Sequence, residues 1–107
     1  MTPSELITDE VTSWPGVEAG PGLRGEFSFR VRRREIGHLH GDRAAHFFFP
    51  EDVWAELFSQ GRIGYHPVFP TRQGPAARRI DAEDDVREVI ALMRLNYDRL
   101  VAAAPAR

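Results

Sequence analysis

The chain has 107 residues, of which 42% are apolar and 28% are charged, and its formal net charge is −2 at pH 7. This length suits a single domain over residues 1–107 with one hydrophobic core. The slightly acidic balance provides no overall attraction to nucleic acid or to a membrane surface. The chain contains no cysteine, which excludes a disulfide scaffold, a thiolate zinc site and a cysteine nucleophile.

No apolar run approaches the length that spans a membrane. The first five residues lack the basic and apolar regions of a signal peptide. We therefore expect a cytoplasmic protein without a membrane partner. No sequence motif indicates a bound cofactor, because a glycine-rich phosphate loop before a helix is missing.

Apolar residues recur at helical spacing in three segments and alternate as in strands between them. In chain order we predict a helix over residues 4–13 capped by Ser4, a short strand and turn over 17–25, strands over 26–32, 35–40 and 44–49, a helix from Pro50 to Gly61, strands over 63–69 and 76–80, and a long helix that Asp81 caps. Short connections between the strands favour an antiparallel sheet of about four to six strands, with the N-terminal, middle and long C-terminal helices on one face. The fold class is therefore α+β.

Two local patterns make further structural predictions. The pair Arg33-Arg34 falls between two strands and is expected to form a hairpin turn. The run Phe47-Phe48-Phe49 places aromatic rings on both faces of a strand, because side chains alternate between the faces. We expect two of these rings in the core, and the third could line a ligand pocket or a surface for self-association.

His38 and His40 are the strongest candidates for chemistry. Two residues apart on a strand, they point to the same face and could hold one metal ion. A third ligand is needed, and the candidates are Glu35, Asp42, His46 and His66, with His66 taken as the leading one. The alternative is a half-buried polar cluster in which both histidines bond to Glu35 or Asp42 and fix the register of the hairpin.

The same segment could instead perform acid/base catalysis through Glu35, His38 and His40, because neutral histidine exchanges protons near pH 7. Serine and threonine do not occur in a nucleophile motif. A small-ligand site on this strand face would comprise Arg34, His38, His40, Asp42 and His66.

The run from Arg30 to Arg34 could bind a phosphate or carboxylate through paired guanidinium hydrogen bonds. The alternative is a solvated strand that resists edge-to-edge pairing. Glu26 and Glu35 flank the run and neutralise much of its field. Nucleic-acid binding through these arginines is therefore the least favoured hypothesis.

Several motifs resemble a known family. The most specific are Trp14-Pro15-Gly16, within residues 11–17, and the segment from Arg34 to Asp42, in which Glu35 to Asp42 reads Glu-Ile-Gly-His-x-His-Gly-Asp. The others are Glu26-Phe27, Phe49-Pro50, Gly61-Arg62, His66 and Leu95 to Tyr97. Together they are similar to the luciferase-domain family, small proteins of unknown function. The chain departs from that pattern over residues 71–78, where Arg72-Gln73-Gly74-Pro75 stands in place of an expected Ser-Gly-Trp.

The family name does not imply the chemistry of the flavin-dependent luciferases, which are TIM barrels of about 250 residues. The order of predicted elements is also similar to that of the MmcQ/YjbR-like domains, which are often suggested to bind DNA, although fold does not fix function.

Three hypotheses follow. The first is a domain that binds a small ligand or a protein partner, with a homodimer as one candidate, through the His38/His40 face. The second is a metal-dependent or acid/base enzyme built on Glu35, His38, His40, Asp42 and His66. The third is nucleic-acid binding through Arg30 to Arg34.

Overall fold

The computed structural model describes residues 1–103 and contains the predicted classes of element. In chain order they are α1 (Pro3–Val11), β1 (Val17–Pro21), β2 (Phe27–Val31), β3 (Arg34–His40), β4 (Ala44–Phe48), α2 (Glu51–Ser59), β5 (Gly64–Tyr65), β6 (Pro75–Arg79) and α3 (Glu83–Ala102). The α+β fold is confirmed.

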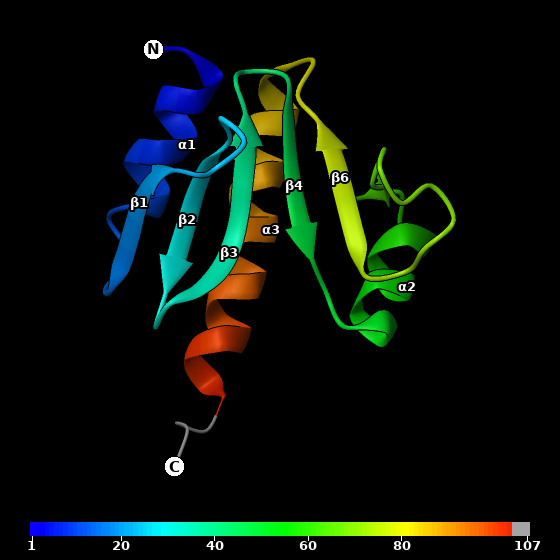
Figure 1. Cartoon of the computed structure of the whole chain (residues 1–107). Helices are drawn as coiled ribbons and strands as arrows, with labels where there is room; N and C mark the ends of the chain where they lie inside the picture. Colours follow the sequence, from blue (N-terminus) through cyan, green and yellow to red (C-terminus); the bar gives the residue numbers. More distant parts are fainter. Residues whose placement is uncertain (104–107) are drawn as a thin grey trace.

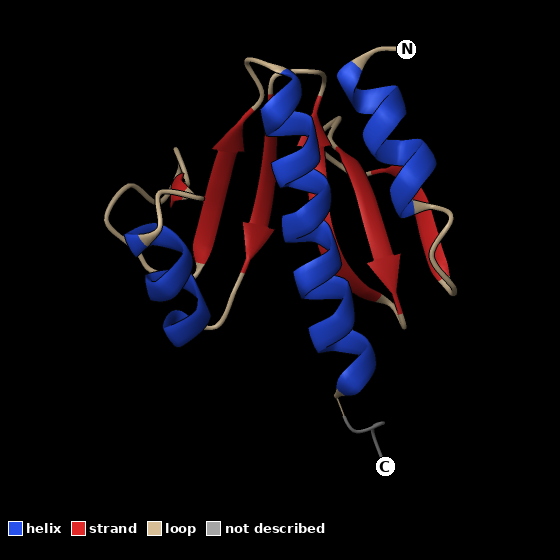
Figure 2. Ribbon diagram, turned by 180° about the vertical axis from the view of Figure 1, so that it is seen from behind, coloured by secondary structure: helices blue, strands red, loops and turns tan. Residues whose placement is uncertain are grey.

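The six strands form one sheet in the order β1-β2-β3-β4-β6-β5, and every neighbouring pair is antiparallel (Figure 1). Figure 2 shows the three helices on one face of this sheet, with α3 crossing its centre and α1 and α2 nearer its edges. We call the opposite face, which is turned toward the viewer in Figure 1, the open face. None of the helices among residues 1–103 has the length and apolarity needed to cross a membrane.

The hydrophobic core lies between the sheet and the helices. Strand alternation places Phe29 and Val31 of β2 and Leu39 of β3 on the helix side, where all three are buried. The long helix contributes one buried stripe, namely Val86, Val89, Leu92, Met93, Tyr97 and Leu100. Phe47 and Phe49 are buried, whereas Phe48 is exposed, so the prediction that two of these rings belong to the core is confirmed.

Gly37 allows α3 to approach β3 closely. A Cβ atom at this position would lie 2.9 Å from both Met93 Sδ and Phe47 Cδ1. Real Cβ atoms do not approach other heavy atoms so closely, and a packed core cannot absorb an extra methyl without shifting. Gly37 therefore fixes the distance between the long helix and the strand that carries His38 and His40.

Both predicted helix caps were wrong by a residue or two. Thr2 caps α1 instead of Ser4: its hydroxyl accepts a hydrogen bond from Glu5 N, and the Glu5 carboxylate accepts one from Thr2 N. At α3 the N-cap is Ala82 instead of Asp81. The carboxylate of Asp85, in the first turn, accepts hydrogen bonds from the backbone N–H groups of Asp81 and Ala82 and so fixes the chain where it enters the helix.

Two strand boundaries also differ from the prediction. Arg32 and Arg33, with φ of 52° and 66°, form the β2–β3 turn instead of Arg33-Arg34. Two positive φ values give the turn a twist that matches the flanking strands. The strand expected over residues 63–69 shrinks to β5, followed by an isolated bridge between His66 and Phe69, because Pro67 within this segment and Pro70 directly after it lack N–H donors.

Candidate metal centre

The open face carries a cluster of histidines. His38 and His40 lie on β3 and point to the same face, and His46 lies directly opposite His38 on the neighbouring strand β4. His66 follows β5, and its ring centroid is 4.2 Å from that of His46. Two strands and a loop thus bring all four histidines of the chain together. We call these four residues the histidine cluster.

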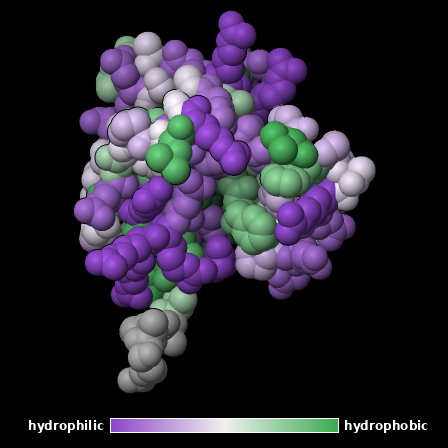
Figure 3. Space-filling view, viewed as in Figure 1, coloured by the Kyte–Doolittle hydropathy of each residue, from purple (hydrophilic) through white to green (hydrophobic). Residues whose placement is uncertain are grey.

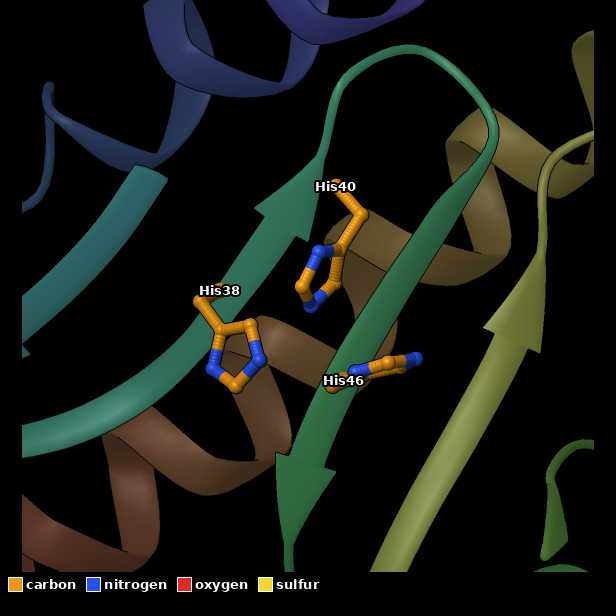
Figure 4. A group of neighbouring side chains, drawn as sticks. All are labelled: His38, His40 and His46. Carbon is orange, nitrogen blue, oxygen red and sulfur yellow. The ribbon is translucent and has the colours of Figure 1, made fainter. Parts of the chain in front are cut away.

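Three members of the cluster converge as metal ligands do. One ring nitrogen from each of His38, His40 and His46 lies within 4.8 Å of the other two. Figure 4 shows the rings of His38 and His40 directed from β3 toward His46 on β4. His40 is exposed and His38 is half-buried, whereas His46 is only 8% exposed. Two solvent-accessible rings therefore stand beside one that is packed into the protein.

A β-bulge brings Glu35 to the same face. Phe29 pairs with Gly37 and Arg30 pairs with Glu35, so Ile36 is an extra residue in β3. On a regular strand, residues three apart point to opposite faces. The bulge reverses this alternation, and the Glu35 carboxylate consequently reaches the ring of His38.

Glu35 links two polar side chains of the open face. Its Oε1 accepts a hydrogen bond from Ser28 Oγ at 2.8 Å, and its Oε2 lies 3.1 Å from His38 Nδ1. Burial opposes ionisation of Glu35, but the hydrogen bonds from His38 and Ser28 and the charges of His38 and Arg30 outweigh it and lower the pKa of the carboxyl. A carboxylate can only accept, so Nδ1 of His38 donates, and in the neutral form of the ring Nε2 keeps its lone pair.

His46 is buried without a polar partner. Among the described residues, its Nδ1 is the one buried side-chain nitrogen or oxygen that has no hydrogen bond. The far end of the ring points toward β6, so Nδ1 is the nitrogen nearer to His38 and His40 (Figure 4). Burial, and then the charges of His66, His40 and His38, lower the pKa of His46 from 6.5 to about 4. The ring is therefore neutral at pH 7.

His66 plays a different part from the other three. Its Nδ1 accepts a hydrogen bond from Val68 N at 3.1 Å. In the neutral ring the proton is then on Nε2, so neither nitrogen has a free lone pair for a metal. Its nitrogens are not among the converging group of three. Burial, and then the charges of His38 and His40, lower the pKa of His66.

The other residues of the predicted sites lie elsewhere. Asp42 accepts a hydrogen bond from Ser4 N at 2.8 Å and so ties the β3–β4 turn to the start of α1. Arg34 pairs with Val31 at the opposite end of β3 from His40, and its charge adds to burial in lowering the pKa of Arg99. Arg32 donates to Val101 O at 3.1 Å, at the end of α3. Asp42 and Arg32 thus hold elements together, and the converging group of three nitrogens includes none of these side chains.

A family model described as Luciferase domain matches residues 33–96, more than half of the chain. The chain belongs to the luciferase-domain family. No curated protein and no solved structure matches it. The matched segment of this luciferase-domain protein begins at the β2–β3 turn and ends at Asn96, so it contains the whole histidine cluster and Glu35.

Sequence reasoning missed two supporting residues of the luciferase-domain protein. Asn96 is buried in α3, and its Nδ2 donates to Ile36 O at 2.8 Å and to Phe48 O at 3.3 Å. It therefore holds the bulge from behind the sheet. Ser28 is also buried, and its hydroxyl donates to Glu35. Phe27 and Phe29, which flank Ser28 and point to the helix side, place Ser28 on the open face. Only the bulge in β3 shows that Glu35 is its hydrogen-bond partner.

The three ring nitrogens lie close to the spacing that a bound metal requires. Tetrahedral coordination by imidazole needs metal–nitrogen distances of about 2.0–2.1 Å, which places the nitrogens roughly 3.4 Å apart. The three nitrogens already lie within 4.8 Å of one another. Rotation of the exposed His40 and the half-buried His38 can supply the difference, while His46 stays in its buried position.

Proposed function

We propose that this luciferase-domain protein binds one divalent transition metal on the open face through His38, His40 and His46. The observation that carries the proposal is the convergence of one ring nitrogen from each of the three histidines, together with the buried, unpartnered Nδ1 of His46. A buried polar atom normally has a partner. A metal ion would provide one for Nδ1 and would join it to the other two rings.

The contact between Glu35 and His38 supports the proposal independently. Histidines that bind metals commonly donate their second ring N–H to a carboxylate, which fixes the tautomer and makes the ligand more basic. Glu35 accepts from Nδ1 of His38 and is held in turn by Ser28. His38 is thus fixed in the tautomer that offers Nε2 to a metal.

The ligand set favours zinc or a related ion of the first transition row. Imidazole nitrogen suits zinc, copper, nickel and iron, and a site with three protein ligands leaves a position for water or a substrate. A bound zinc ion would act as a Lewis acid or would lower the pKa of its water ligand toward neutrality. Because the site lies on the open face, that position would be accessible from solvent.

Metal-free acid/base catalysis is a second candidate, and one observation favours it. Ser28, Glu35 and His38 form a continuous hydrogen-bonded chain that would orient His38 as a general base. The two candidates differ in one respect that can be measured. Acid/base activity would survive treatment with a chelator, whereas metal-dependent activity would be lost and then restored by the metal.

The test of the metal proposal begins with protein purified without a histidine tag. Elemental analysis after loading with zinc and desalting should give about one zinc per chain. The triple variant His38→Ala, His40→Ala, His46→Ala should retain none. His66→Gln is the matched control, because it changes a neighbouring histidine that is not a ligand, and it should keep the metal. Equal zinc content in the wild type and the triple variant would refute the proposal.

A further inference from the structure

We propose that the metal centre binds monocarboxylates with an apolar tail, the carboxylate on the metal and the tail over an apolar strip formed by Phe48, Val68 and Phe69. This inference rests on the proposed metal site and names its class of ligand. The strip is an exposed surface that the hydrophobic core does not explain: Phe48, Val68 and Phe69 are 57%, 67% and 41% exposed. Figure 3 shows a hydrophobic patch over β6 and the segment after β5.

The strip is continuous with the metal ligands. The ring of His66 lies 4.2 Å from that of His46 and 5.5 Å from that of Phe69, measured between centroids. Phe48 follows His46 by two residues on β4 and therefore lies on the same face. The hydrogen bond from Val68 N to His66 fixes the loop that presents the strip. A ligand held at the metal would thus find apolar surface directly beside it.

The charged residues around the histidine cluster favour an anionic ligand and set the direction in which its tail lies. Glu35 stands on the His38 side of the cluster, where it would repel a carboxylate. The opposite side is formed by residues 60–80, which include no aspartate or glutamate. Three of the four arginines in this segment pair with carboxylates of residues 81–88. The fourth, Arg72, has its guanidinium 5.5 Å from the centre of the Phe69 ring and carries the argument for an anion. An anionic headgroup on the metal with a tail toward Phe69 satisfies both constraints.

The length of the tail should therefore control the affinity. A methylene that is fully removed from water strengthens binding about fourfold. The strip covers one side of a tail only, so we expect about twofold per methylene, and octanoate, with six more methylenes, should bind about sixtyfold more tightly than acetate.

The test uses the full chain loaded with cobalt in place of zinc. The visible spectrum of the bound cobalt reports changes in the ligands of the metal. Acetate, butanoate and octanoate are titrated separately. The double variant Val68→Ser, Phe69→Ser removes two of the three apolar side chains of the strip, leaves Phe48 in place and keeps the backbone N–H that bonds to His66. Leu23→Ser is the matched control, because Leu23 is a fully exposed apolar residue in the β1–β2 turn, outside the strip.

The proposal requires octanoate to bind more tightly than acetate in the wild type and in Leu23→Ser. In the double variant this preference should fall to less than about threefold, with the affinity for acetate unchanged. Equal affinities for the three acids in cobalt-loaded wild type would overturn the inference and leave the metal site intact. Equal octanoate binding after removal of the metal would also overturn it.

Light scattering measures the oligomeric state of the wild type and the double variant. A wild-type dimer together with a monomeric double variant would assign the strip to a second copy of the chain and overturn the inference. Failure to bind cobalt at all would instead refute the proposed function, so the two failures are distinguishable.

Discussion

The Glu35 carboxylate lies 3.1 Å from Nδ1 of His38, although the two residues stand three apart on one strand. Strand alternation alone would place them on opposite faces. The extra residue Ile36 in β3 puts them on the same face. The ligand sphere of the proposed metal thus depends on an irregularity in the backbone as much as on the residues themselves.

Glu35→Gln should weaken zinc binding about 10- to 100-fold, because it removes the carboxylate that fixes the tautomer of His38. Competition with a coloured zinc chelator measures the affinity. Glu26→Gln is the matched control, since it removes a nearby carboxylate that makes no hydrogen bond to a histidine. Equal weakening in the two variants would assign the effect to net charge and contradict the proposed role of Glu35.

Asn96→Ala should destabilise the protein by about 1–3 kcal/mol, because the buried Ile36 carbonyl loses its side-chain partner. It should also weaken zinc binding, because the bulge that positions Glu35 would loosen. Urea unfolding and the chelator assay measure the two effects. Asp98→Ala changes a surface ion pair with Arg94 on the same helix and should stay within about 0.5 kcal/mol of the wild type. Wild-type stability in Asn96→Ala would contradict this role.

Gly37→Ala should cost about 1–3 kcal/mol of unfolding free energy, because the added methyl collides with Met93 and Phe47. Thermal or urea unfolding measures the loss. Gly20→Ala serves as the control: Gly20 also lies in a strand, and a Cβ atom there would meet nothing within 4 Å. A similar loss in both variants would show that close packing of α3 on β3 is not the cause.

The stability of the metal-free protein should fall as the pH drops from 6.5 to about 4. Over that range the unfolded chain protonates His46, whereas the folded protein, in which its pKa is about 4, keeps the ring neutral. The unfolded state then binds more protons, which costs the folded state up to about 3 kcal/mol. His46→Leu should have a smaller slope in urea unfolding across this range. An unchanged slope would show that His46 is accessible to protons in the folded state.

The sequence predicted the parts of the fold that follow from periodicity. The alternation of Phe27, Phe29 and Val31 identified β2, and the apolar stripe that includes Val89 and Met93 identified α3. The predicted helix caps and the position of the arginine turn were wrong by one or two residues. Several neighbouring residues could cap each helix or form the hairpin turn equally well.

The candidate site was less accessible to sequence reasoning. His38 and His40 were identified because they stand two apart on one strand. His46 was only one of several candidates for a third ligand, because its position opposite His38 depends on the pairing of β3 with β4. Asn96 is 60 residues from the carbonyl it supports. No local pattern signals such a contact, and nothing in the sequence marks Ile36 as the residue of the bulge.

X-ray absorption at the zinc edge of tag-free, zinc-loaded protein tests the central claim most directly. We expect one zinc per chain with three imidazole nitrogens at about 2.0–2.1 Å and one exchangeable oxygen ligand, and we expect this pattern to persist in His66→Gln. A shell of oxygen ligands alone, or loss of an imidazole in His66→Gln, would contradict the assignment of His38, His40 and His46 as the metal ligands.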